Sequence, residues 1–219
     1  MKIAIMQPYF LPYVGYWKLL NAVDKFVIHD DVQYIKGGWI NRNEIMMNGE
    51  KKYITLPVKK KKHDSNINEM IIDKLNPIFL KSYNRIVNNY KISSQFNEVM
   101  PLVDEIFGYQ SDNLSEFVVN SIELVMNYLS IDTELVFSSK LKNNKSLKGQ
   151  KKVIEICKIL EADKYYNLPG GISLYSFDDF ENNQVELNFI GQEIQPEMYI
   201  SIIDLMFNVS SEKISNKIL

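Results

Sequence analysis

Short apolar runs alternate with longer stretches of helical period along much of this 219-residue chain. Residues 3–6 and 25–29 are apolar runs too short for a helix, so we expect each to form a buried strand. Between them, a loop with two prolines at 7–12 leads into a helical pattern over residues 15–23. A strand, a loop, a helix and a strand within about 30 residues predict a βαβ unit. Its two strands should be parallel.

The same alternation returns in the second half of the chain. It predicts strands at 134–137, 164–167 and 185–189, with helices between them at 146–160, where Ser146 can cap the first turn, and at 175–181. Consecutive βαβ units favour an α/β fold with a Rossmann-like, doubly wound parallel sheet. We expect residues 1–219 to form a single domain.

The middle of the chain follows a different pattern. Residues 53–58 are rich in β-formers, and a helix should begin at Pro77, after Asn76, and run to about residue 90. Asn113 and Glu116 form a capping-box pattern before a long run of helical period. We therefore expect a helical insert within the α/β domain, near residues 70–130.

Composition places the chain among soluble globular proteins, with 46% hydrophobic and 24% charged residues. One cysteine excludes an internal disulfide and favours a reducing compartment, so we expect a cytoplasmic protein. That cysteine, Cys157, lies on the apolar face of a predicted helix and is interpreted as a core residue. The sequence predicts no secretory signal and no transmembrane segment.

Charge is unevenly distributed along the chain. The net charge of −2 argues against a nucleic-acid partner. Residues 36–62 nevertheless hold eight basic and two acidic residues, a net +6, which leaves −8 for the rest. The run at 59–62, which begins with Lys59, fits either a solvated hairpin tip or an anion site for phosphate or carboxylate.

Candidate chemistry gathers where the predicted strands end. Ligands of open parallel sheets bind beyond the carboxyl ends of the strands. Those ends carry Gln7, the His-Asp-Asp tandem at 29–31, and Gly170 with Gly171. These three segments should open onto one crevice.

His29 abuts Asp30 and Asp31, which should raise its pKa and favour a general acid/base role. A structural histidine bonded to a carbonyl at the strand end is the alternative. The two aspartates should face opposite ways, so that one of them enters the crevice. The tandem spacing does not favour a metal site.

A second polar cluster surrounds Arg42, one of only two arginines. Two glycines and Trp39 precede it, and Asn41 and Asn43 flank it. A planar guanidinium beside amides suits phosphate or carboxylate, although a turn with a stacked tryptophan is the alternative. Tyrosines near the candidate loops, among them Tyr9, Tyr13 and Tyr34, suit sugar or base stacking or belong to the core.

Five motifs together resemble the WbqC-like family across nearly the whole chain. They are MQPYFLPYVGY at 6–16, HDDVQY at 29–34, GWINRN at 38–43, TLPV at 55–58 and SIIDLMFN at 201–208. The resemblance implies a role in bacterial surface polysaccharide biosynthesis, such as O-antigen or capsule. It also implies transfer of an acyl or aminoacyl group, such as glycine, to an amino sugar.

A fainter resemblance links the first βαβ unit to nucleotidylyltransferases, whose His-x-Gly-His motif binds nucleotide phosphates, and implies a nucleotidyltransferase-like form of the Rossmann-like sheet. The matching positions hold Tyr13, Val14, Gly15 and Tyr16, so both histidines are missing. Adenylyl transfer by that route is therefore disfavoured. Binding of a nucleotide or CoA-like phosphate at the helix amino end remains compatible with the pattern.

Our leading hypothesis is a transferase acting on a nucleotide-linked amino sugar, with a phosphate-bearing small molecule as its partner. His29 would act as the base, Asp30 or Asp31 would orient it, and Arg42 with Lys59 would hold the phosphates. A non-catalytic module that binds a nucleotide sugar or a partner enzyme is one alternative, and an altered nucleotidyltransferase is another. The sequence identifies neither a cofactor nor the oligomeric state.

Overall fold

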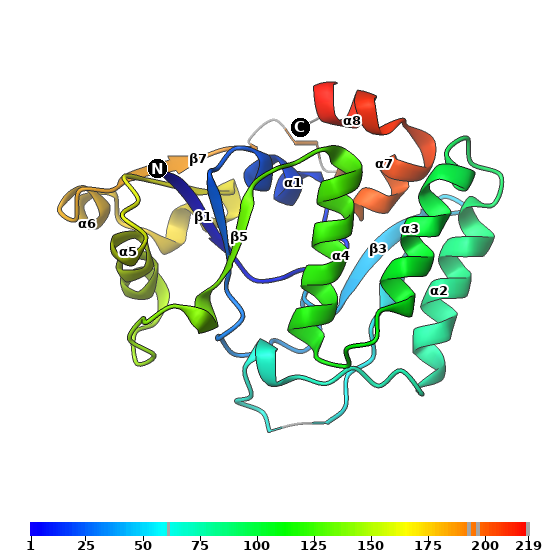
Figure 1. Ribbon diagram of the computed structural model, residues 1–219, viewed down its shortest axis with the longest axis horizontal. Coiled ribbons are helices and arrows are strands. Elements are labelled where there is room, and N and C mark those ends of the chain that lie inside the picture. The colour runs from blue at the N-terminus through cyan, green and yellow to red at the C-terminus, as the bar shows by residue number, and fades with distance from the viewer. Residues whose placement is uncertain (61, 192–193, 196–197, 218–219) are drawn as a thin grey trace.

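A five-stranded sheet, parallel throughout, forms the centre of the computed structural model, which describes residues 1–60, 62–191, 194–195 and 198–217 (Figure 1). The strand order is β5-β2-β1-β6-β7. The strands are β1 (Lys2–Met6), β2 (Lys25–Ile28), β5 (Glu134–Phe137), β6 (Lys164–Asn167) and β7 (Glu186–Phe189). Every adjacent pair is parallel, so the predicted α/β class with a mostly parallel, Rossmann-like sheet is confirmed.

Helices cover both faces of this sheet. Successive strand residues point to opposite sides, so both faces carry apolar side chains that helices bury. Ala4 and Phe26 belong to the larger core, with α1 (Val14–Asn21) and α4 (Leu114–Leu129). Ile5 and Val27 belong to a second core, with α5 (Gly149–Ile159) and α6 (Phe177–Glu181). The sheet is therefore wound with helices on each side, and its strand ends meet along one edge.

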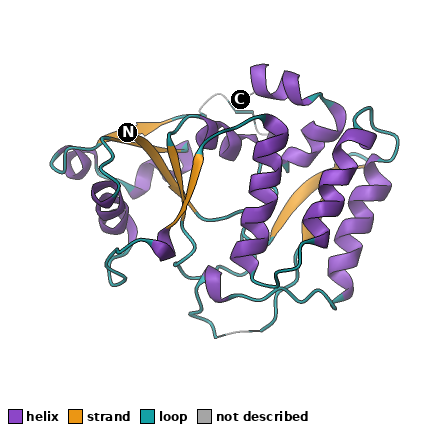
Figure 2. Cartoon of the chain, in the orientation of Figure 1, coloured by secondary structure: helices purple, strands orange, loops and turns teal. Residues whose placement is uncertain are grey.

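The segment between β2 and β5 holds an antiparallel hairpin and three long helices. The hairpin consists of β3 (Arg42–Met47) and β4 (Glu50–Thr55). The 3₁₀ turn η1 (Ile67–Glu69), α2 (Pro77–Tyr90) and α3 (Phe96–Gly108) follow it. Figure 2 shows α2, α3 and α4 side by side, and contacts link α2 to α3 and α3 to α4. That this region forms an insert in a single domain stays a prediction.

Two local predictions differ from the structure, and one helix lies where no individual element was predicted. That helix is α3, in which Val99, Val103 and Ile106 bury one face despite Pro101 inside it. At α4, the amide of Glu116 donates to Asn113 Oδ1, 3.1 Å away. The Glu116 carboxylate, however, accepts from the Ser111 hydroxyl at 2.6 Å, so only half of the capping box forms.

Helix α5 begins at Gly149 rather than at Ser146. The Ser146 hydroxyl donates to Asn144 Oδ1 at 2.8 Å and is therefore occupied within the preceding turn. The N-cap residue, Lys148, makes no side-chain capping bond. The side chain of the N-cap residue therefore leaves the amides in the first turn of α5 uncapped.

Helix α7 (Ile202–Asn208) and its N-cap residue Ser201 fasten the hairpin and the loop after β1, while α8 (Ser211–Lys217) contacts α4 and α7. The Ser201 hydroxyl donates to the Leu11 carbonyl at 2.8 Å. The amide of Met46 donates to the Asp204 carboxylate at 3.2 Å. Among the described residues, no helix has the length and apolar character needed to span a bilayer.

Candidate functional site

A cavity of about 820 Å³ opens at the carboxyl ends of β2 and β5. Ile28 and Phe137 are register partners, so the residues after both strands lie next to one another. Its lining comes from the turn after β2, the η1 region and the start of α5: His29, Asp31, Val32, Gln33, Asp64, Asn66, Asn68, Glu69, Ser139, Lys145, Leu147, Lys148, Gly149 and Lys152.

Asp30 lies beneath the cavity and joins the ends of the two strands. Its side chain is buried. One carboxylate oxygen accepts from the Ser139 amide at 2.9 Å, and the other accepts from the Ser139 hydroxyl at 2.6 Å. Ser138 Oγ lies 3.2 Å from the first of these two oxygens. These bonds satisfy a buried charge and fix the turn that carries His29.

Asp31 lines the cavity and is held by two lysines. Lys145 Nζ lies 2.7 Å from Oδ2, and Lys152 Nζ lies 2.9 Å from Oδ1. The Ser138 hydroxyl donates to Oδ1 as well. Burial opposes ionisation, but these hydrogen bonds outweigh it and hold the pKa of Asp31 well below its ordinary value. Of the two aspartates, only Asp31 lines the cavity, as the alternation predicts.

His29 is mostly buried, and its Nε2 lies 4.0 Å from Asp31 Oδ1. Within the described part of the chain, Nε2 has no hydrogen-bond partner. Burial, and then the charge of Lys152, lower the pKa of His29 to about 4, although both aspartates act to raise it. The prediction of a raised pKa is therefore wrong, because desolvation and a buried lysine outweigh the carboxylates. The ring is neutral at pH 7.

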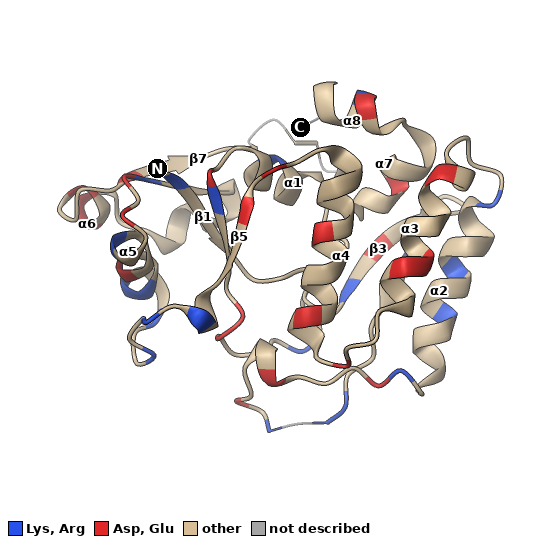
Figure 3. Ribbon diagram, in the orientation of Figure 1, with Lys and Arg blue, Asp and Glu red and all other residues tan. Residues whose placement is uncertain are grey.

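Charges of opposite sign enter the cavity from different segments. Lys145, Lys148 and Lys152 come from the start of α5 and the loop before it, whereas Asp64 and Glu69 come from the η1 region. Figure 3 shows basic positions between β5 and α5, next to the acidic turn after β2. The amides at the start of α5 add positive potential, so the lysine end suits a phosphate or carboxylate.

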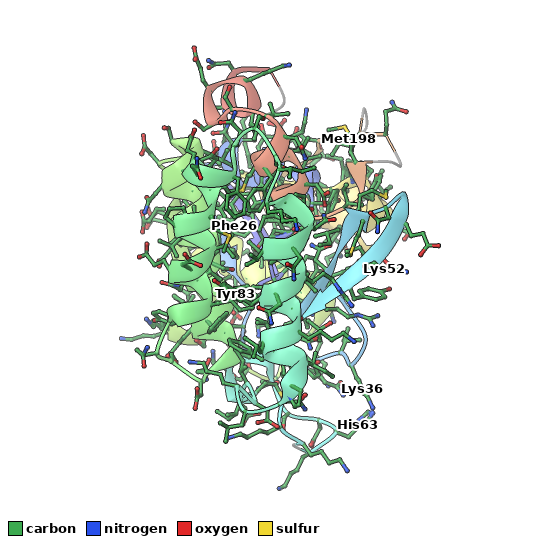
Figure 4. All side chains as sticks on the ribbon, turned by 90° about the vertical axis from the view of Figure 1, so that its right-hand side faces the viewer. Phe26, Lys36, Lys52, His63, Tyr83 and Met198 are labelled. Atoms are coloured by element: carbon green, nitrogen blue, oxygen red, sulfur yellow. The ribbon has the colours of Figure 1, made fainter. Side chains whose placement is uncertain are left out.

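Arg42 and Lys59 do not line this cavity. The Arg42 guanidinium donates to the carbonyls of Gly37 and Gly38 and stacks 4.3 Å above the Tyr53 ring. Lys59 is exposed, and its amide donates to Ile71 O at 2.8 Å. Lys61 lies outside the described residues. Figure 4 shows Lys36 and His63 at one end of the molecule and Lys52 away from them on the hairpin.

The flanking amides hold the backbone together. Asn41 accepts from the Tyr34 hydroxyl at 2.8 Å and donates to Leu56 O at 2.7 Å. Asn43 donates to Leu11 O at 2.7 Å. Both amides are buried, so their hydrogen-bonding capacity serves the fold.

The remaining candidates lie along the edge near β1 and β6. The backbone amide of His29 donates to Met6 O, which places Gln7 in the chain beside the tandem, but the Gln7 side chain does not line the cavity. Gly171 is close to Asn167, where an added Cβ would lie 2.9 Å from Nδ2, while a Cβ at Gly170 would meet nothing within 4 Å. Neither glycine lines the large cavity.

A second, smaller cavity of about 90 Å³ collects several of the aromatic candidates. Its lining residues are Tyr9, Pro12, Tyr13, Trp39, Asn43 and Tyr199. The structure therefore places His29 and Asp31 at the large cavity and Tyr9, Tyr13, Trp39 and Asn43 at the small one, whereas the other candidates line neither cavity.

Sequence reasoning missed Ser138, Ser139, Lys145 and Lys152. The two serines directly follow the strand at 134–137, so the same carboxyl-end rule that selected His29 would have found them. Lys152 gave a weaker signal, because it lies among the apolar residues of α5.

Cys157 is fully buried, and burial raises the pKa of its thiol to about 12, which confirms its interpretation as a core residue. In the described ranges, no group of three or more His, Cys, Asp or Glu side chains is arranged to hold a metal ion.

Comparison with known proteins places this architecture in a family. No solved structure matches the chain. The chain is 29% identical to the uncharacterized protein Rv1507c of Mycobacterium tuberculosis over 225 residues, which is 96% of this chain and 95% of that protein. The model of the WbqC-like protein family matches residues 7–216, a range that includes the 820 Å³ cavity and its lysines. The chain belongs to the WbqC-like protein family.

Proposed function

We propose that the protein is a cytoplasmic transferase that moves an acyl or aminoacyl group onto the amine of a nucleotide-linked amino sugar. Such a reaction would serve the synthesis of bacterial surface polysaccharide. The observation that supports it best is His29, a neutral imidazole that lines a large cavity and whose buried Nε2 has no hydrogen-bond partner among the described residues. A neutral imidazole is able to accept a proton.

In the proposed reaction, the sugar amine attacks the carbonyl carbon of the acyl donor. A C–N bond forms, and the bond between the carbonyl and the donor's leaving group breaks. Nitrogen becomes acidic as it gains the acyl carbon, and His29 Nε2 takes its proton. The leaving group departs with the electron pair of the broken bond. Asp31, 4.0 Å from Nε2, stabilises the resulting imidazolium.

Phosphate binding is assigned to Lys145 and Lys148 with the amides at the start of α5. This replaces Arg42 and Lys59, whose guanidinium and ammonium groups are not at the cavity. A bound phosphate would offset the positive charge of the lysines. Because Lys152 and Lys145 both lower the pKa of His29, phosphate would raise that pKa toward its ordinary value and make His29 a stronger base.

The amino sugar is assigned to the end of the cavity near η1. Asn66 and Asn68 supply amides for sugar hydroxyls, and Asp64 and Glu69 attract an amine. Asn68 is also tied to the site, since its amide donates to the buried Asp30 at 3.5 Å.

The test is an incubation of purified protein with nucleotide-linked amino sugars and a panel of acyl and aminoacyl donors, with products identified by mass spectrometry. We expect amide formation that is lost in His29→Ala and weakened, through a higher KM, in Lys145→Ala. The matched control is His63→Ala, which removes the other histidine, a residue that does not line the cavity.

Three results would contradict the proposal. Full turnover in His29→Ala would show that His29 is not the general base. Binding of the nucleotide sugar with no product for any donor would instead favour a non-catalytic binding module. Release of pyrophosphate from a nucleotide would favour nucleotidyl transfer.

A further inference from the structure

The small aromatic cavity differs from the large one in having an uncharged lining. Of the described residues that form it, four are aromatic, one is proline and one is an asparagine: Tyr9, Tyr13, Trp39, Tyr199, Pro12 and Asn43. Trp39 is 43% exposed and Tyr199 is 45% exposed, so two large rings face solvent. Exposed aromatic faces with polar tips are typical of recognition surfaces.

One wall is built on Gly15. A Cβ at this position would lie 2.5 Å from Cε2 of Tyr13, so only glycine lets the Tyr13 ring lie against the start of α1. The Tyr13 ring then stacks on Tyr199, with centroids 4.9 Å apart and planes at 24°. Two segments far apart in the sequence thus form one fixed aromatic wall.

The opposite side depends on the loop at 37–43. Arg42 holds this loop by donating to the carbonyls of Gly37 and Gly38, and its guanidinium covers the Tyr53 ring. Tyr53 lies 6.5 Å from Trp39, between ring centroids. Trp39 is therefore supported on a loop that is already bonded in place, which reduces the entropy lost when a ligand binds.

Asn43 connects the two sides. Its amide donates to the carbonyls of Phe10 and Leu11, at 3.3 and 2.7 Å. The loop that carries Tyr9 and Tyr13 is thereby fastened to the strand that follows Trp39. Glycine, arginine and asparagine of the two sequence motifs thus serve to hold the aromatic rings in position.

We propose that this aromatic cavity binds a neutral glycosyl ring. Its uncharged lining does not attract a phosphate, which the lysines of the large cavity suit better. Aromatic faces pack against the C–H face of a sugar, while tyrosine hydroxyls and the indole N–H bond its hydroxyls. A volume of about 90 Å³ is smaller than the ~150 Å³ that encloses benzene, so the ring would lie partly in solvent. The inference does not depend on His29 or on acyl transfer.

The protein's two tryptophans make a direct test possible. Trp17 is fully buried, so acrylamide quenching of fluorescence reports mainly on the exposed Trp39. The probes are glucose, galactose, N-acetylglucosamine and N-acetylgalactosamine, with adenosine as the arm for base stacking. We expect at least one of the four sugars to protect Trp39 from acrylamide and to give saturation-transfer NMR signals.

Variants locate the binding. We expect Tyr199→Ala to weaken sugar binding by about fivefold. Trp39→Ala should weaken it to the same extent, measured by NMR because this variant lacks the fluorescent reporter. Phe177→Ala, which changes an exposed aromatic residue outside the cavity, should bind sugar as the unchanged protein does. Retained thermal unfolding would show that the variants fold. Protection by adenosine alone, no signal with any of the four sugars, or equal affinity in Tyr199→Ala would overturn the proposal.

Discussion

The ammonium of Lys152 lies 2.9 Å from Asp31 Oδ1 in an ion pair whose two side chains are only 3% and 6% exposed. Lys152 also donates to the backbone carbonyl of Asp31 at 3.4 Å. Through Lys152, helix α5 thus brings a positive charge to the wall of the cavity and is bonded to the turn after β2. The pair links the stability of the sheet edge to the electrostatics of His29.

Removal of this buried lysine should be strongly destabilising. Lys152→Met leaves Asp31 buried with Lys145 as its one remaining lysine partner among the described residues, and loss of one member of a buried pair costs about 3 kcal/mol. Urea unfolding at pH 7 measures the change. Lys145→Met is the control: its side chain is 54% exposed, so we expect a loss below about 1 kcal/mol. Equal losses would contradict a dominant role for Lys152.

The depressed pKa of His29 should appear as a pH dependence of stability. The unfolded chain binds a proton near pH 6.5, but the folded protein does not bind it until about pH 4. The free energy of unfolding therefore has its full value, as far as His29 is concerned, above pH 6.5. It decreases as the pH falls toward 4, by up to about 3 kcal/mol.

His29→Gln should remove that dependence, because glutamine does not titrate. The measurement is urea unfolding from pH 4 to pH 7 for the unchanged protein, His29→Gln and the control His63→Gln. We expect the free energy of unfolding of the unchanged protein to fall relative to that of His29→Gln as the pH falls from 7 to 4. NMR titration of the His29 ring gives its pKa directly, and a value near 6.5 would contradict the burial argument.

Asp204 should show the opposite dependence. Burial raises its pKa to about 6, despite hydrogen bonds that include the one from the Met46 amide. The folded protein binds this proton more tightly than the unfolded chain does. The stability that this proton contributes is therefore fully present below about pH 4 and is lost as the pH rises through 6. Asp204→Asn should stabilise the protein by about 3 kcal/mol at pH 8 and by little at pH 4. Thermal unfolding at both pH values measures this, and a variant destabilised at pH 8 would contradict it.

Single residues show which features of the fold and of the site could be predicted from the sequence. The apolar runs predicted the parallel strands, because a run of four or five buried residues has few other solutions in an α/β chain. The position of His29 at a strand end predicted its cavity, since that rule depends only on topology. Its pKa direction was wrong, because Lys152 is distant in sequence and its burial depends on how α5 packs.

Arg42 illustrates the other limit. Its neighbours predicted an anion site, but its donors are satisfied by the carbonyls of its own loop. Local sequence does not distinguish an arginine that binds a ligand from one that binds a turn, since both occur beside glycine and asparagine. The separation of Trp39 from His29 into two cavities follows from the hairpin's packing, which no local pattern encodes.

Gly15 provides a final prediction that joins packing to the aromatic cavity. In Gly15→Ala the new methyl group meets Tyr13 at 2.5 Å and Ile194 at 2.8 Å, so the Tyr13 ring must move. We expect a loss of about 1–3 kcal/mol in urea unfolding, as for other overpacked cores, together with weaker protection of Trp39 by sugar. Gly108→Ala is the matched control, because a Cβ there meets nothing within 4 Å and Gly108 ends a helix. It should be neutral or slightly stabilising. If Gly15→Ala behaved like this control, Tyr13 would not be held by its contact with Gly15, and the aromatic wall would not be fixed in advance of ligand binding.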